Sequence, residues 1–248
     1  MTKQRIQVTI ISDTELAIYN MNYLADRINL ALSHGGLSAT AFWLLKILCR
    51  IKVHFLYAID LANRSATSKT STHHPDFDFI SLHTQHDIDS APSALIAQLN
   101  EQSGLSVNRL IEQGSTVYAL VDDSNIVSQL NIGWQPIITV DSPTHLTFTL
   151  SPKDAFLGYL FTYPKYRGCG AATKLVEKVC EDAAFRKYSR IVTHIRSTNA
   201  PSLNTFKKIG WKRIGWILTS TNGRLLSTRS AKKMGVHIAK ANHPAIDG

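Results

Sequence analysis

The spacing of apolar and polar positions changes along the chain, and each spacing predicts a different kind of element. Apolar residues recur at helical intervals over 13–33 and 38–50, and a run rich in β-branched and aromatic residues follows at 53–59. These patterns predict two helices and then a strand. The segment 63–75 is polar throughout, so we expect a solvated linker there and place a domain boundary at its end.

From residue 77 onward, short apolar runs alternate with longer amphipathic stretches. The expected strands are 77–82, 116–121, 126–132, 136–140, 146–150, 155–162, 190–195 and 211–219. The expected helices are 91–102, 106–112, 170–185 and 201–209. Antiparallel strands followed by a strand–helix–strand–helix segment predict an α/β fold of the α+β kind, with a central, mostly antiparallel mixed sheet flanked by helices.

Composition adds a preference for anionic partners without choosing one. The chain has 27 Lys and Arg against 18 Asp and Glu, a formal net charge of +9. Such an excess favours a phosphorylated cofactor, an acidic carrier protein, nucleic acid or an anionic membrane surface. Because the sequence carries no nucleic-acid-binding signature, we do not expect nucleic acid as a partner.

Three features of the chain bear on its compartment. Cys49, Cys169 and Cys180 are far apart, which argues against a disulfide framework and favours a reducing, cytoplasmic location. The N-terminus has no secretory signal pattern. The longest apolar stretch, 37–61, is interrupted by basic residues, and its uncharged part is too short to span a bilayer. We expect a buried helix and a strand there; a basic amphipathic helix in peripheral contact with a membrane is the alternative.

The most informative segment is the glycine-rich turn before the expected helix at 170–185. Gly168 and Gly170 permit left-handed torsions and close approach of a ligand, and Ala171 and Ala172 keep bulky side chains out of the first helical turn. The unpaired N–H groups and the positive end of the helix dipole make such a turn suited to a pyrophosphate. The G-x-G-x-x-G spacing of dinucleotide-binding folds is absent.

Two segments carry a resemblance to a known family. The run RGCGAA at 167–172 resembles the R-x-x-G-x-[GA] signature of the GNAT superfamily of acyl-CoA-dependent N-acyltransferases, and the strand that precedes it resembles the signature strand of that family. The segment 199–211 resembles the N-x-x-[AS]-x-x-x-[YF]-x-K-x-G-[FW] segment of the same family. The resemblance implies a GNAT-like fold, with an N-terminal helical and strand extension at 1–75, an acyltransferase domain at 76–235 and a C-terminal tail at 236–248.

The resemblance also implies an activity. It implies an acyltransferase, in the first place an N-acetyltransferase, that moves an acyl group from acetyl-CoA or another acyl-CoA directly to an amine of a small molecule or amino sugar, without a metal. The cofactor-binding residues that it implies are Leu160, Thr162, Lys165, Arg167, Gly168, Cys169, Gly170, Ala171, Ala172, Asn199, Ser202 and Phe206. One alternative is a long-chain synthase of N-acyl amino acids that uses acyl-CoA or an acidic acyl carrier protein. Another is a non-catalytic CoA sensor.

The catalytic groups are less clearly marked than the cofactor loop. The resemblance implies that a backbone N–H near Thr162 or Tyr163 polarises the thioester carbonyl. Phe206 stands where many members have a tyrosine, and phenylalanine cannot donate a proton. Tyr159, Tyr163 and Ser202 are therefore the candidate acids.

The candidate bases are Asp154, His145 and His194, although Asp154 also fits a turn residue after Pro152. Cys169 is interpreted as a backbone donor in the phosphate loop, because the family forms no covalent intermediate. The histidines His73, His74, His83 and His86 are interpreted as a solvated surface cluster, so we expect no metal site.

Overall fold

The computed structural model describes residues 51–62, 76–140, 146–222, 224–232 and 235–240. The chain divides into two compact units, Met1–Ile51 and Lys52–Gly248. The description below concerns the second unit, together with the strand that begins at Ile51. The helices expected at 13–33 and 38–50, and the residues His73, His74 and His145, lie outside the described residues.

Most of the expected elements are present, with bounds that differ by a few residues. The strands are β1 (Ile51–Asp60), β2 (Asp78–Leu82), β3 (Ser115–Asp122), β4 (Asn125–Gly133), β5 (Ile137–Val140), β6 (Leu146–Thr149), β7 (Asp154–Thr162), β8 (Arg190–Arg196), β9 (Lys212–Ser220), β10 (Leu225–Ser227) and β11 (His237–Lys240). The helices are α2 (Gln85–Ser90), α3 (Ser93–Gln102), α4 (Val107–Glu112), α5 (Ala171–Phe185), α6 (Ala200–Lys208) and α7 (Arg229–Lys232), with the 3₁₀ turn η2 at Pro164–Tyr166.

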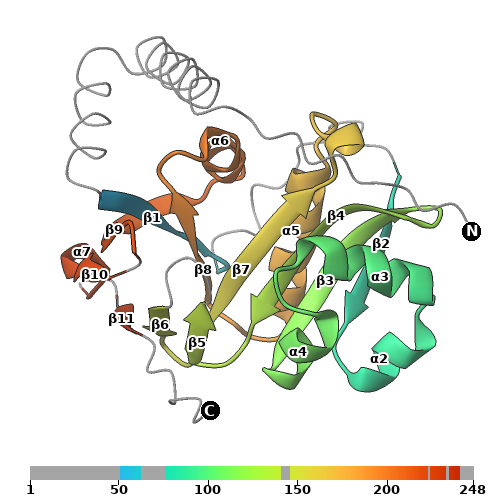
Figure 1. Cartoon of the computed structure of the whole chain (residues 1–248), viewed down its shortest axis with the longest axis horizontal. Coiled ribbons are helices and arrows are strands. Elements are labelled where there is room, and N and C mark those ends of the chain that lie inside the picture. Colours follow the sequence, from blue (N-terminus) through green and yellow to red (C-terminus); the bar gives the residue numbers. More distant parts are fainter. Residues whose placement is uncertain (1–50, 63–75, 141–145, 223, 233–234, 241–248) are drawn as a thin grey trace, which may run out of the picture. The chain divides into compact units, whose positions relative to one another are not determined.

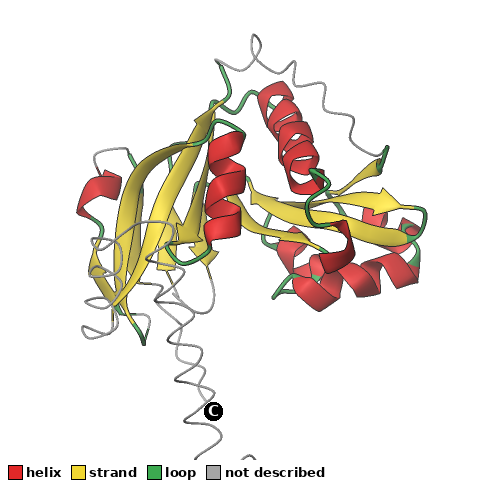
Figure 2. Cartoon of the chain, turned by 90° about the horizontal axis from the view of Figure 1, so that it is seen from above, coloured by secondary structure: helices red, strands yellow, loops and turns green. Residues whose placement is uncertain are grey.

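Eight strands form the central sheet in the order β10-β9-β1-β8-β7-β4-β3-β2 (Figure 1). The pairs β2–β3, β3–β4, β4–β7 and β1–β8 are antiparallel, whereas β7 and β8 are parallel. Helices lie on both faces of the sheet (Figure 2). The expected fold class, a mostly antiparallel mixed sheet flanked by helices, is confirmed.

The strand expected at 53–59 lies inside the sheet and not at its edge. β1 is hydrogen-bonded to both β8 and β9, and Tyr57 stands opposite Thr193 of β8. Leu56 and Tyr57 point to opposite faces and are 0% and 3% exposed. A continuous apolar run of this kind is typical of a strand that is covered on both faces.

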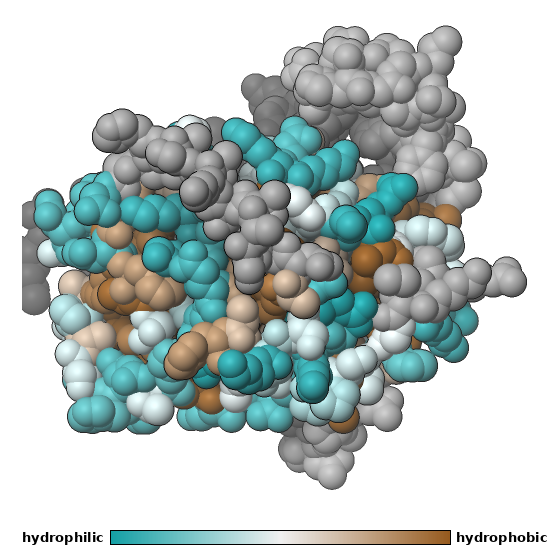
Figure 3. Space-filling view, turned by 180° about the vertical axis from the view of Figure 1, so that it is seen from behind, coloured by the Kyte–Doolittle hydropathy of each residue, from teal (hydrophilic) through white to brown (hydrophobic). Residues whose placement is uncertain are grey.

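Three apolar clusters hold the unit together. α5 and α6 pack on one face of the sheet through Leu175 and Phe206, and α2, α3 and α4 pack on the opposite face of β3 and β4 through Leu99 and Leu110. The third cluster joins β1 and β8 to a small sheet, in the order β11-β6-β5, through Phe148. On the face seen in Figure 3, exposed apolar residues form scattered patches among hydrophilic ones.

Several parts of the described chain depart from the expectations, and β10 and α7 were not among the expected elements. α2 was not expected, although Thr84 caps it and Asp87 completes a capping box. The segment 236–248 was expected as a tail, but His237–Lys240 forms β11, which pairs with β6. None of the helices that the structure describes is long and apolar enough to cross a lipid bilayer.

Candidate functional site

The strand β7 leaves its parallel neighbour halfway along its length. The pairing of β7 with β8 begins at Asp154 opposite Arg190 and ends at Leu157 opposite Thr193, although β7 continues to Thr162. On its other side, β7 stays paired with β4 as far as Thr162. The sheet is therefore open beside residues 158–162, and backbone groups on that side of β7 face an opening instead of a strand.

One pocket lies where this part of β7 runs into the glycine-rich turn. We call it the glycine-turn pocket; it has a volume of about 570 Å³ and lies between the end of β7, the start of α5 and one side of α6. Nine of the twelve expected cofactor-binding residues line it: Leu160, Thr162, Arg167, Gly168, Gly170, Ala171, Ala172, Asn199 and Ser202. Two segments about 30 residues apart in the sequence thus line the same pocket.

The turn has the backbone that its glycines predict. Gly168 and Gly170 have φ angles of +86° and +83°, a region in which side chains with a Cβ are strained. Gly170 is the N-cap of α5 and provides no side-chain cap for the first helical turn. The N–H groups of that turn have no intrahelical partners, and the helix dipole adds positive charge at the same place. This end of the pocket suits an anion.

The second wall of the glycine-turn pocket comes from one face of α6. The Asn199 side chain caps α6 by accepting a hydrogen bond from the Ser202 N–H at 3.3 Å. Pro201, Thr205 and Lys208 follow at helical spacing and also line the pocket. Arg167 lies at the mouth, where its Nε donates a hydrogen bond to the Thr162 carbonyl at 3.1 Å. Two cations therefore flank the pocket.

Three expected cofactor residues do not line the pocket. Lys165 lies over the ring of Tyr166, and the Cys169 thiol donates to the Tyr166 carbonyl. Phe206 is 2% exposed and packs edge-on against Trp211 with ring centroids 4.8 Å apart, because its position on α6 faces the sheet. Phe206 belongs to the apolar core of the unit.

Thr162 and Tyr163 were both expected near the reacting carbonyl, but only Thr162 lines the glycine-turn pocket. Thr162 lines the pocket, and its hydroxyl lies 2.9 Å from the Ser128 hydroxyl. The Tyr163 N–H donates to the Val127 carbonyl at 3.0 Å, and the Tyr163 hydroxyl donates to the Gln98 carbonyl of α3 at 2.8 Å. Tyr163 therefore has both its donors engaged and anchors the end of β7 to α3.

Asp154 is far from the rest of the expected site. It stands at the opposite end of β7 from Thr162, is 4% exposed, and forms an ion pair through both carboxylate oxygens with Arg190 of β8. The structure does not bring Asp154 to the pocket. A paired, buried carboxylate at the start of two parallel strands serves to hold their register.

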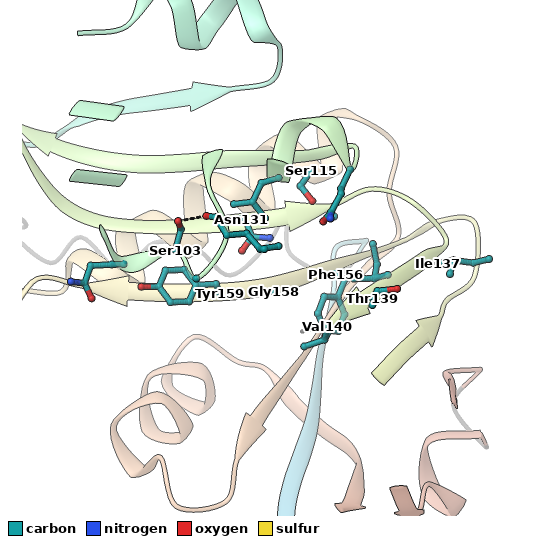
Figure 4. Close-up of a pocket in the computed structure, with 16 residues that line it drawn as sticks. Ser103, Ser115, Asn131, Ile137, Thr139, Val140, Phe156, Gly158 and Tyr159 are labelled. Carbon is teal, nitrogen blue, oxygen red and sulfur yellow. Dashed lines mark hydrogen bonds between the residues drawn. The ribbon is translucent and has the colours of Figure 1, made fainter. Parts of the chain in front are cut away.

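A second pocket opens on the opposite side of β7, toward α3, α4 and β5. We call it the β5 pocket; it has a volume of about 640 Å³ (Figure 4). Its lining includes Gly158 and Tyr159 of β7, and the lining of the glycine-turn pocket begins at the next residue, Leu160. The two pockets therefore border consecutive residues in the unpaired part of β7.

The floor of the β5 pocket is shaped by two glycines. β7 has a register shift against β4 beside Gly158, where Asn131 is opposite Tyr159 but Ile132 is opposite Leu157. A Cβ built on Gly158 would lie 2.9 Å from Asn131 Nδ2, and one built on Gly133 would lie 2.5 Å from Ile138 Cδ1. Bare backbone at these positions is what lets the Asn131 amide and the β5 strand lie close to the sheet.

Two titratable residues near the β5 pocket have shifted pKa values. Burial raises the pKa of the Tyr159 hydroxyl, with a contribution from Tyr163, so this hydroxyl stays protonated at neutral pH. Burial, assisted by the charge of Arg196, lowers the pKa of His194 to about 4. His194 does not line the pocket; its ring stacks on those of Phe148 and Phe156 behind the pocket wall.

Of the four histidines that were expected to form a solvated cluster, the structure describes His83 and His86, and His86 is exposed. His83 is partly buried, where its ring nitrogens lie 3.0 Å from the hydroxyls of Thr116 and Ser81 and Arg186 approaches from α5. Among the residues that the structure describes, no group of three or more His, Cys, Asp or Glu side chains is arranged to hold a metal ion.

Apart from Tyr159, which was expected as a candidate acid, the sequence did not predict the β5 pocket, and it predicted only part of the glycine-turn pocket. The β5 pocket is assembled from α3, α4, β3, β4, β5 and β7, and no single segment carries a motif for it. In the glycine-turn pocket, the contributions of Thr205 and Lys208 were missed. Their spacing from Pro201 along one helix was the available signal.

Comparisons with known proteins bear on the family of this chain. The model of the Acetyltransferase (GNAT) family matches residues 78–211, which is more than half of the chain. Among curated proteins, no sequence similar to this one is found. The matched range contains all the lining residues of both pockets, from Gln102 to Lys208.

Solved structures of similar fold have low sequence identity. A protein of the GNAT family from Novosphingobium aromaticivorans is 16% identical, with a TM-score of 0.45 over 68% of this chain and 63% of that one. An aminoglycoside antibiotic 6'-N-acetyltransferase from Acinetobacter baumannii is 16% identical, with a TM-score of 0.39 over 56% of this chain and 92% of that one. This chain thus spans less than two thirds of the Novosphingobium protein. The match of the family model over residues 78–211 shows that the chain belongs to the GNAT acetyltransferase family.

Proposed function

We propose that this protein transfers an acyl group, in the first place acetyl, from a CoA thioester to the amine of a small acceptor by direct attack. The observation that carries the proposal is that two pockets of different chemistry border consecutive residues in the unpaired part of β7, Tyr159 and Leu160. The glycine-turn pocket would hold the pyrophosphate and pantetheine of the donor, and the β5 pocket would hold the acceptor.

The charge around the glycine-turn pocket supports an anionic donor. Arg167 and Lys208 line the pocket beside the first turn of α5. The sequence from residue 183 to residue 246, which includes β8, α6 and β9, contains 13 Lys and Arg and no Asp or Glu. Such a field raises the local concentration of a polyanion such as CoA and speeds its association.

The proposed reaction needs few protein groups. The amine nitrogen attacks the thioester carbon, a C–N bond forms, the C–S bond breaks, and one proton passes from nitrogen to the departing sulfur or to solvent. Backbone N–H groups of β7 beside the opening would stabilise the negative charge on the carbonyl oxygen. The protonated Tyr159 hydroxyl is the proposed proton donor to the thiolate, because Tyr159 lines the β5 pocket and the next residue, Leu160, lines the glycine-turn pocket.

The test combines binding and turnover. CoA is titrated into the folded protein by calorimetry, and thiol release from acetyl-CoA is followed with a panel of amines. We expect micromolar CoA binding and amine-dependent thiol release. Acyl donors of increasing chain length then separate an acetyltransferase from a long-chain enzyme. CoA binding with no turnover on any amine and any donor would instead support a CoA sensor, and the absence of CoA binding would overturn the proposal.

A further inference from the structure

The β5 pocket has two ends of different character. In Figure 4, Ser103 and Tyr159 lie at one end, and Phe156, Val140 and Ile137 lie at the other. Asn131 and Gly158 lie between them. The first end offers hydroxyl groups, and the second offers the aliphatic side chains of Ile137 and Val140 together with the Thr139 hydroxyl. The Phe156 ring at this end is 0% exposed and belongs to the apolar core.

The polar groups nearest the opening in the sheet are available to a ligand. The structure gives the Asn131 amide and the Tyr159 hydroxyl no hydrogen bond to another described residue. The Asn131 amide lies against Gly158, at the point where β7 begins to diverge from β8. An amide has both donors and an acceptor, and the protonated tyrosine hydroxyl has one donor and acceptor lone pairs. These two groups suit an amine together with a neighbouring hydroxyl or amide.

The apolar end is held in place by close packing. The Ile138 side chain lies directly on the backbone of Gly133, so β5 lies close against the end of β4. Val140 packs against the apolar cluster that contains the fully buried Phe156. Such a wall gains free energy by taking apolar surface out of water and cannot replace the hydration of a charged group.

We infer that the acceptor is an amine on an otherwise uncharged body, with a hydroxyl or amide beside the amine and an alkyl or aryl group at the far end. The polar side chains that line the pocket are neutral amides and hydroxyls. Hydrogen bonds from these groups can replace the water bound to a ligand hydroxyl, so burying that hydroxyl costs little free energy. A carboxylate or a second ammonium on the acceptor would lose its hydration without gaining an opposite charge from these groups. This inference rests on the proposed function, because it takes the β5 pocket as the acceptor site.

The test uses four amines that share one skeleton and differ in one group. They are phenylalaninol, phenethylamine, phenylalanine and 3-phenylpropane-1,2-diamine, and their binding is measured by calorimetry with and without CoA present. We expect phenylalaninol to bind about tenfold more tightly than phenylalanine or the diamine, with phenethylamine in between. In Tyr159→Phe, the advantage of phenylalaninol over phenethylamine should fall about threefold.

A charge placed at the polar end sharpens the result. Gln102 lines this pocket, so Gln102→Glu should raise the affinity for the diamine about tenfold relative to phenylalaninol. Gln135 is exposed and does not line the pocket, so Gln135→Glu is the matched control and should change neither affinity. The inference is overturned if phenylalanine or the diamine binds the unaltered protein as tightly as phenylalaninol, or if none of the four binds. Loss of the proposed function is recorded separately, as absence of CoA binding and thiol release.

Discussion

The two pockets on either side of β7 differ in the groups that we propose bind their ligands. In the glycine-turn pocket, main-chain N–H groups at the start of α5 would bind the anionic donor. Gly168 and Gly170, with positive φ angles, form the turn before this helix, and Arg167 and Lys208 line the pocket. In the β5 pocket, side chains would bind the acceptor, through neutral amides and hydroxyls at one end and apolar groups at the other. Main-chain recognition fixes one ligand group across many proteins, whereas side-chain recognition varies freely.

This difference has a consequence for mutagenesis. A substitution that disturbs the backbone of the glycine turn should weaken binding of the acyl donor and leave the preference among acceptors unchanged. A substitution in the β5 pocket should do the reverse. The four predictions that follow test this separation, from the largest expected effect to the smallest.

The first prediction concerns the backbone of the glycine turn. Gly170→Val forces a β-branched residue into φ +83° and places a side chain where the pyrophosphate is proposed to lie. We expect CoA affinity to fall about 100-fold or more. Gly210→Val is the control, because Gly210 has φ +93° with open space around it and lies outside both pockets. If both variants lost CoA equally, general strain and not the turn would be responsible.

The second prediction concerns pH and the side of the sheet that holds the β5 pocket. Burial lowers the pKa of His194 to about 4, below its ordinary value of 6.5. Below about pH 6.5 the unfolded chain therefore binds this proton and the folded chain does not, so stability falls as the pH drops toward 4. Between pH 7.5 and pH 4 the loss attributable to His194 is about 3 kcal/mol.

Chemical denaturation of the protein and of His194→Leu between pH 4 and pH 7.5 checks this. The difference in unfolding free energy between the two should shift in favour of the variant as the pH falls. A constant difference across this range would show that His194 titrates alike in the folded and unfolded states.

The third prediction tests the floor of the β5 pocket. Gly158→Ala places a methyl group against the Asn131 amide, which must shift to make room. We expect the acceptor kcat/KM in the thiol-release assay to fall about tenfold, with the Kd for CoA changed less than twofold. A loss of CoA affinity as large as the loss of turnover would show that the two pockets are not separate.

The fourth prediction compares two adjacent lysines. Lys207 and Lys208 are both exposed at the end of α6, but only Lys208 lines the glycine-turn pocket. Lys208→Gln should weaken CoA binding about fivefold and reduce the dependence of the Kd on salt, and Lys207→Gln should change the Kd by less than twofold. Equal effects of the two would point to the general positive field instead of a contact.

The sequence predicted the features that depend on neighbouring residues and missed those that distant segments form together. The glycine turn and the helix at 201–209 were expected because each depends on neighbouring residues. In the structure, Gly170 is the left-handed N-cap of α5, and the Asn199 side chain caps α6. Phe206 was assigned to the cofactor because a motif gives a residue type without the direction in which its side chain points. The core position of Phe206 follows from packing against Trp211.

The β5 pocket and the place of β1 depend on distant pairings. Six elements contribute to the pocket, and the hydrophobic pattern of each is satisfied equally well by an ordinary core position. The strand at 53–59 was expected from its composition, but its neighbours are β8 and β9, which follow more than a hundred residues later. No local rule fixes which strands an apolar run will join.

The position of β1 sets an order of events during synthesis. The ribosome makes β1 before any other strand of the sheet, yet both of its partners belong to the last third of the chain. Until residues 190–220 have emerged from the ribosome, β1 lacks both strands with which it pairs in the folded protein, and Leu56 and Tyr57 lack their contacts with them. Closing the sheet then requires a contact of high sequence separation, which slows folding. The newborn protein should accordingly depend on chaperones that hold an early strand until its late neighbours arrive.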